Sequence, residues 1–259
     1  MDQPQETLPR PPQEEQDDPV DALVQRGRKQ RRLFDVPGYE EAIPLLREAI
    51  ELAPTQAPAY AELSLAYSSW GLRRESACLG FRHETQLPEY QSLYDLAFDY
   101  ADMALRLAPD LAASHLAMAA ALRSGAKADP ARRAREAALA LALEPEDPEV
   151  VCECWRVKGY DPEDQAVLQT MEKAPWLIQM RLDLAAALCE RGRYADALAQ
   201  LKQALQASPE NTHIYYEIAM LLQRKGMRRD AIELLGKAKA MRPNDPLVRQ
   251  GLVLLGESL

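Results

Sequence analysis

The feature that most constrains the fold of this chain is a short pattern that recurs along it. Two alanines stand seven residues apart, a proline follows five residues after the second, and the pattern begins at Ala42, Ala97, Ala197 and Ala231. Seven residues make two turns of an α-helix, so each alanine pair lies on one helix face, where small side chains let a neighbouring helix approach closely. The proline ends the helix because it has no N–H to donate and restricts the residue before it.

The helix-ending prolines also define a period. They stand at positions 54, 109, 145, 175, 209 and 243, and the last three are 34 residues apart. A second amphipathic stretch precedes most of the alanine pairs, with apolar residues at helical spacing. Gly71, Gly192 and Gly226 follow three of these stretches, where a tight turn between two helices needs a residue that tolerates a positive φ. The sequence therefore predicts a repeated helix–turn–helix unit.

This pattern resembles the tetratricopeptide repeat (TPR), whose signature is an aromatic, a leucine and small residues on the first helix, then Gly, then Ala, a bulky residue, Ala and Pro. The best units are 178–211 and 212–245, and the resemblance covers roughly 20–245. It implies an all-α, right-handed superhelix of about six helix pairs. The resemblance is to bacterial-type TPR proteins, and we recognise no attached effector domain. The expected units are 20–56, 57–109 with an insertion over 72–91, 110–145, 146–175, 178–211 and 212–245.

The two ends of the chain and its middle depart from the period. Residues 1–19 are rich in proline and acidic residues and are expected to be disordered, because they cannot bury enough apolar area to offset their chain entropy. Residues 246–259 are expected to form a capping helix, which a solenoid needs to cover its last apolar face. The irregular units lie in the middle, so we expect the superhelix to bend or change pitch there.

Charge and motifs restrict the function classes. The chain has 31 Lys and Arg against 40 Asp and Glu, a net charge of −9, which argues against a general nucleic-acid binder. The three histidines and four cysteines form no metal-binding or nucleophile motif, and no phosphate-binding glycine loop occurs. We expect no catalytic residue, no cofactor and no metal. With no secretion signal and no long apolar run, we expect a cytoplasmic protein without a membrane span.

The resemblance implies a function in protein–protein interaction, as an adaptor, assembly factor or regulator. In TPR folds the first helix of each pair lines a concave groove, and the matching positions predict a partner-binding groove made of Leu65, Ser68, Arg123, Leu182, His213, Tyr216, Met220 and Gln223. The Lys and Asn of a carboxylate clamp are absent at these positions. The expected ligand is therefore an extended apolar peptide or an amphipathic helix.

A basic stretch allows other interpretations. It contains Arg26, Arg28, Lys29, Arg31 and Arg32. It could be a solvated helix face, a local nucleic-acid site, or a patch that the acidic tail shields until a partner displaces it, through Glu14, Glu15, Asp17 and Asp18. A different alternative is a self-assembling scaffold that forms homo-oligomers through its apolar C-terminal cap.

Overall fold

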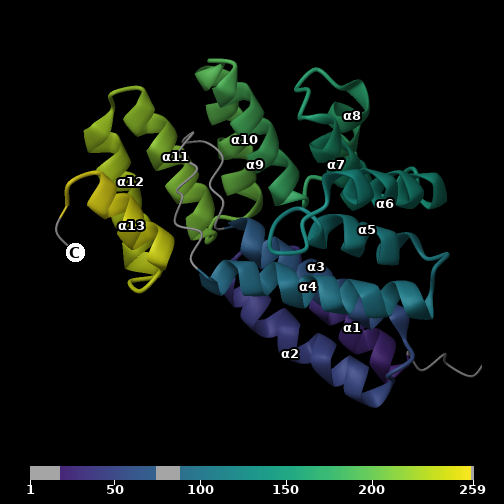
Figure 1. Ribbon diagram of the computed structural model, residues 1–259. Helices are drawn as coiled ribbons and strands as arrows, with labels where there is room; N and C mark the ends of the chain where they lie inside the picture. Colours follow the sequence, from purple (N-terminus) through teal and green to yellow (C-terminus); the bar gives the residue numbers. More distant parts are fainter. Residues whose placement is uncertain (1–17, 74–87, 258–259) are drawn as a thin grey trace, which may run out of the picture.

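The computed structural model describes residues 18–73 and 88–257, and this part of the chain is helical, with no strand (Figure 1). The helices are α1 (Pro19–Arg31), α2 (Val36–Leu52), α3 (Ala57–Arg73), α4 (Pro88–Leu107), α5 (Ala112–Ala121), α6 (Pro130–Leu143), α7 (Pro148–Lys158), α8 (Gln165–Lys173), α9 (Ile178–Glu190), α10 (Tyr194–Ala207), α11 (Thr212–Arg224), α12 (Arg228–Met241) and α13 (Pro246–Leu254).

Consecutive helices pack as six pairs, from α1 with α2 to α11 with α12, and α13 packs against both helices of the last pair. This arrangement confirms the predicted all-α solenoid of six helix pairs with a C-terminal capping helix. The predicted tail and much of the predicted insertion, residues 1–17 and 74–87, lie outside the described residues.

The second helix of a pair ends where the sequence pattern places its end. The residue before each helix-ending proline has left the helical region, as in Ala53, Ser208 and Arg242, with φ of −138°, −141° and −139°. A proline clashes with a helical residue in front of it and pushes that residue towards extended φ and ψ. The proline spacing therefore fixes the period of the solenoid.

The alanine pairs lie at the contacts between helices. All eight alanines of the pattern have no exposed surface: Ala42, Ala49, Ala97, Ala104, Ala197, Ala204, Ala231 and Ala238. A larger side chain at these positions would force neighbouring helices apart in a close-packed interior. Alanine at this spacing thus serves packing as well as helix formation.

The predicted glycine turns are correct at two of three positions. Gly192 and Gly226 have φ of +73° and +77° and connect the helices of their pairs. Gly71 instead lies inside α3, which continues to Arg73. A Cβ at Gly71 would lie 2.8 Å from the Tyr94 ring, so this glycine permits close packing of α3 against α4.

The solenoid returns onto its own beginning. In Figure 1 the pairs run in an arc from α1 and α2 to α11, α12 and α13, and the two ends approach each other. Asn211 Nδ2 donates hydrogen bonds of 3.1 Å to the carbonyls of Leu33 and Phe34. The Phe34 ring stacks on His213, with centroids 5.7 Å apart, and Arg242 lies 3.3 Å from Asp35. We call this contact between the α1–α2 turn and the last pairs the closure contact.

Candidate functional site

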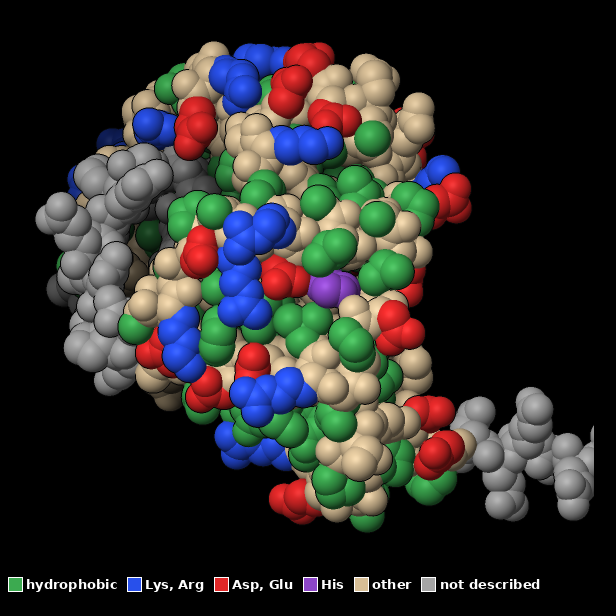
Figure 2. All heavy atoms as spheres, turned by 45° about the vertical axis from the view of Figure 1, so that its right-hand side comes forward, with side chains coloured by type: hydrophobic (Ala, Val, Ile, Leu, Met, Phe, Trp, Pro, Cys, Tyr) green, Lys and Arg blue, Asp and Glu red, His purple; other side chains and the backbone are tan. Residues whose placement is uncertain are grey.

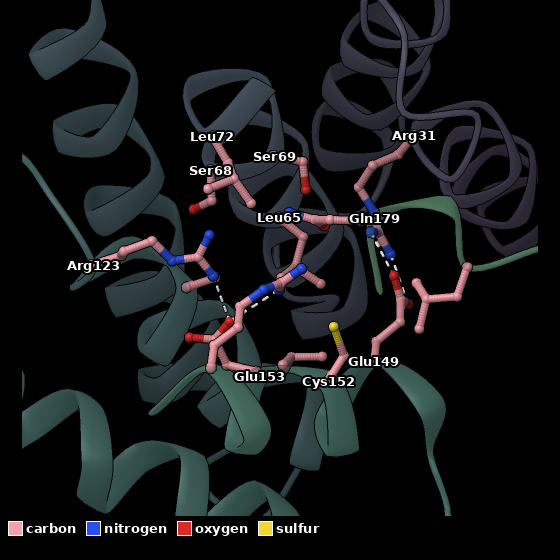
Figure 3. A pocket seen from close by; sticks show the side chains of 14 residues that line it. Arg31, Leu65, Ser68, Ser69, Leu72, Arg123, Glu149, Cys152, Glu153 and Gln179 are labelled. Atoms are coloured by element: carbon pink, nitrogen blue, oxygen red, sulfur yellow. Dashed lines mark hydrogen bonds and ion pairs between the residues drawn. The ribbon is translucent and has the colours of Figure 1, made fainter. Parts of the chain in front are cut away.

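The first helices of the pairs, α1, α3, α5, α7 and α9, enclose a small, charged pocket, which we call the concave pocket (Figure 3). Leu65, Ser68, Ser69 and Leu72 of α3 form one wall, and Glu149, Cys152 and Glu153 of α7 form the opposite wall. The pocket has a volume of about 30 Å³. This is room for one or two water molecules and not for a peptide side chain.

Three arginines of α1 and the following turn bind two carboxylates of later units. Glu62 of α3 accepts hydrogen bonds from Arg28 at 2.5 Å and Arg31 at 2.9 Å. Glu149 of α7 accepts from both terminal nitrogens of Arg31, at 2.7 and 2.9 Å, and from Arg32 at 2.9 Å. These ion pairs connect the first, second and fourth helix pairs.

A second cluster continues along the same side. Glu153 of α7 binds Arg123 at 2.5 Å, Arg133 at 2.8 Å and Arg156 at 3.2 Å. Arg156 also donates through Nε to Asp183 of α9 at 2.6 Å. Each cluster contains three guanidinium groups and two carboxylates, so each carries a surplus positive charge.

The pKa values of the buried carboxylates report the competition between burial and charge. Burial alone would raise the pKa of Glu149, but Arg31 and Arg32 outweigh it and lower that pKa to about 2. Burial is likewise outweighed at Glu153 by its three arginines, and its pKa falls to about 2. At Asp183 burial prevails over Arg156 and raises the pKa.

Acidification is expected to destabilise the fold through Glu149 and Glu153. Their pKa in the folded chain lies below the ordinary value of 4.5, so their contribution is complete above about pH 4.5 and is lost as the pH falls towards 2. Each contributes on the order of 3 kcal/mol by this linkage. Asp183 acts in the opposite direction, because its raised pKa means that protonation in acid removes an unfavourable buried charge.

Urea denaturation followed by circular dichroism between pH 7 and pH 2.5 measures the net change in the free energy of unfolding from these three carboxylates. The Glu153→Gln variant should lose less stability on acidification than the wild type, and an equal loss would contradict this account.

The predicted groove residues are not brought together on an accessible surface. Leu65, Ser68 and Arg123 line the small pocket, Leu182 is buried, and Gln223 is exposed. None of these forms part of an open apolar groove.

The aromatic part of the predicted groove is buried in the structure. His213, Tyr216 and Met220 have 4%, 1% and 1% of their surface exposed. Tyr216 and Met220 pack in one cluster with Leu247, Val248 and Leu252 of α13, while His213 stacks on Phe34. The cap and the closure contact cover these side chains, so they pack as core residues in this structure, and their role in partner binding stays a prediction.

The basic stretch is only partly a solvated face. Arg31 is buried, and Arg28 and Arg32 keep about a quarter of their side-chain surface, 28% each, while they bind Glu62 and Glu149. Arg26 and Lys29 are exposed. Sequence reasoning missed the carboxylates because partners 31 to 118 residues away leave no local signal.

A larger groove lies outside the concave pocket, where α1 approaches the turn before α9 and the end of α10. It has a volume of about 490 Å³, and we call it the α1–α10 groove. Its lining consists of Gln25, Arg28, Lys29, Arg32, Leu33, Trp176, Ile178, Ala207 and Ser208.

The α1–α10 groove combines apolar and cationic side chains. Leu33 and Trp176 are 42% and 37% exposed, and the guanidinium of Arg32 lies 4.1 Å from the centre of the Trp176 ring. Lys29 makes no ion pair with any residue in the described part of the chain. Sequence reasoning did not single out Trp176, although its place directly after the helix-ending Pro175 puts it in a turn.

No arrangement for nucleophilic or metal chemistry is found in residues 18–73 and 88–257. Cys152, Cys154 and Cys189 are buried, and burial raises the pKa of Cys152 to about 12, so this thiol stays protonated. The described residues contain no cluster of His, Cys, Asp and Glu able to hold a metal ion, and none of their helices is long and apolar enough to cross a membrane. On the face in Figure 2, positive and negative side chains are interspersed.

Comparison with known proteins agrees with this architecture. A family model described as the tetratricopeptide repeat matches residues 188–253, and a search of curated proteins found no match. The chain is similar to a solved IFIT1 mutant with m7Gppp-AAAA, at 15% identity and a TM-score of 0.61, over 91% of this chain and 53% of that one. Yeast Tom70 is 15% identical with a TM-score of 0.52, over 98% of this chain and 59% of that one. YrrB, a TPR protein with an unusual peptide-binding site, is 18% identical with a TM-score of 0.43, over 79% of this chain and 96% of that one.

At these identities the likeness to the IFIT1 and Tom70 structures concerns the fold alone, and their ligands say nothing about this chain. The fold itself is typical of non-enzymatic scaffolds for protein–protein interaction. With its helix pairs, buried alanine pairs, proline-terminated second helices and the match at 188–253, the chain is similar to tetratricopeptide repeat proteins.

Proposed function

We propose that this protein is a non-catalytic adaptor that holds a segment of a partner protein in the α1–α10 groove. The observation that carries the proposal is the exposure of Leu33 and Trp176, at 42% and 37%, side by side with cations in a groove of about 490 Å³. Large apolar side chains are exposed together mainly where they meet a ligand or another protein.

Two other surfaces are less suited than the α1–α10 groove to holding a partner. The concave pocket holds about 30 Å³ and is crossed by ion pairs, so a peptide cannot enter without breaking them. A nucleic-acid site on the basic stretch has fewer available cations than the sequence indicates, because Arg28, Arg31 and Arg32 already bind carboxylates.

A self-assembling scaffold is the second candidate function. The end of α13 exposes Val253 at 53% and Leu254 at 43%. A second copy of the chain could cover these side chains, and light scattering over a concentration series would then show an increase in mass.

Replacing the apolar residues of the groove is expected to remove the partner. The groove variant carries Leu33→Ser and Trp176→Ala, and the control carries Leu139→Ser and Leu143→Ser on α6, where both leucines are also exposed, at 48% and 46%. Affinity capture with the full chain as bait should recover one partner with wild type and control, at least tenfold reduced with the groove variant. Thermal melts verify that both variants fold.

The other outcomes are equally informative. Retention of the same partner by the groove variant would contradict the proposal and move the site elsewhere. Recovery of the chain alone, together with a concentration-dependent mass, would favour the scaffold.

A further inference from the structure

The α1–α10 groove has a charge opposite to that of the protein. Arg28, Lys29 and Arg32 line it and no carboxylate of the described residues does, although the chain as a whole carries a net charge of −9. A local positive site in an acidic protein favours an anionic ligand and repels cationic ones.

The cations retain hydrogen-bonding capacity. Arg28 binds Glu62 through Nε, and Arg32 binds Glu149 through Nε and one terminal nitrogen, so each keeps N–H groups without a partner among the described residues. This cluster contains three arginines and only two carboxylates, so the buried acids do not cancel all of its positive charge. Lys29 adds an ammonium group that binds none of the described carboxylates.

The guanidinium of Arg32 is also held in place. Its hydrogen bonds to Glu149, at 2.9 and 3.3 Å, and its position 4.1 Å from the Trp176 ring centre restrict its rotation. A cation that is fixed before binding loses less conformational entropy when a ligand arrives. The fixed planar group favours a carboxylate, which two parallel N–H groups can bind.

The two sides of the groove differ in character. Leu33 and Trp176 supply the apolar surface, and Ala207 and Ser208 lie at the C-terminal end of α10. The carbonyl groups at a helix C-terminus carry partial negative charge, which disfavours a carboxylate there. An acidic ligand therefore directs its carboxylates to α1 and its apolar part to Trp176.

The helices also decide how a peptide can bind. The described part of the chain has no sheet edge that could pair with a peptide backbone, so recognition depends on side chains. A groove of about 490 Å³ accepts a few side chains.

We propose that the partner segment in the α1–α10 groove is an acidic peptide with a bulky apolar residue, whose apolar side chain packs against Trp176 and Leu33 and whose carboxylates bind Lys29, Arg28 and Arg32. This inference rests on the proposed function and specifies the chemistry of the ligand at the same site.

Fluorescence polarisation with a defined probe tests the inference. The probe is a fluorescein-labelled octapeptide in which Leu and Phe stand between acidic residues, and two reference peptides replace its acids by Lys or its Leu and Phe by Ser. The full chain should bind the probe and bind both reference peptides at least tenfold more weakly. Affinity for the probe should fall as the salt concentration rises, because surface charges are screened.

Two variants locate the binding. Lys29→Glu and Trp176→Ala should each weaken binding of the probe at least tenfold. Lys225→Glu is the matched control, because Lys225 is also an exposed lysine at the C-terminal end of a helix, and it should leave the affinity within twofold. Both substitutions place a negative charge at the C-terminal end of a helix and should lower stability by a similar amount. A difference in probe affinity between the two variants therefore shows that the probe binds in the groove.

Three results would overturn the inference. These are no saturable binding of the probe up to about 1 mM, equal binding of the Lys-containing peptide, and tighter binding of a labelled single-stranded octanucleotide. In those cases affinity capture still tests the adaptor function separately. A partner that is lost with the groove variant but kept by Lys29→Glu would occupy the groove through apolar contacts alone.

Discussion

Replacement of Glu153 by Ala is expected to lower the free energy of unfolding by about 3–5 kcal/mol, the typical effect of removing one partner from a buried ion pair. Glu153 is 1% exposed and binds Arg123, Arg133 and Arg156. Without it, three guanidinium groups stay close together in the interior with only Asp183 to compensate them. The cost arises from the charges left behind and not from the lost side chain.

Urea denaturation of the two proteins at pH 7 measures this difference. The control is Glu233→Ala on the exposed surface, where Glu233 pairs with Lys237 and both side chains are more than half exposed, 70% and 62%. That change should leave the free energy of unfolding almost unchanged, because exposed pairs of this spacing contribute little. A loss below about 1 kcal/mol for Glu153→Ala would mean that solvent reaches the cluster.

Replacement of Asn211 by Ala is expected to cost about 3 kcal/mol and to release the first helix pair from the last ones. Asn211 is fully buried, its side-chain oxygen accepts from the His213 N–H as the N-cap of α11, and its Nδ2 donates to Leu33 and Phe34. The substitution removes a helix cap and leaves two carbonyl groups unpaired at the closure contact.

Two further variants separate these effects. Asp164→Ala removes the half-buried N-cap of α8, whose side chain caps only this helix, and it should cost only about 1 kcal/mol. Asn211→Asp keeps the cap acceptor, but its ionised carboxylate donates to neither carbonyl, so it should remain destabilising. Hydrogen exchange should show faster exchange in α1 and α2 of both Asn211 variants. Full recovery of stability by Asn211→Asp would mean that the cap alone matters.

The repeat pattern predicted the fold because its signals are local. A proline restricts its neighbour wherever it stands, and an alanine pair two turns apart marks a packing face whatever the partner is. Ala49, Ala204 and Ala238 therefore lie at helix contacts, as expected, with no exposed surface. Gly71 did not form the expected turn because α3 continues past it to Arg73.

The candidate site could not be predicted in the same way. His213, Tyr216 and Met220 have the spacing of groove residues, but a cap helix and a distant phenylalanine cover them. The apolar residues of the α1–α10 groove are instead Leu33 and Trp176, which lie in turns and carry no periodic signal.

The sequence by itself determined the helix pairs, their ends and their packing faces, since these depend on residues within two turns of one another. Only the tertiary structure decided which face is accessible. The pairs of Arg31 with Glu149 and Phe34 with His213 join residues 118 or more positions apart, and they form because the solenoid curves back onto its first unit. That curvature is the sum of small rotations between neighbouring pairs, and it decides whether a cation is solvated, buried with an acid, or placed in a groove.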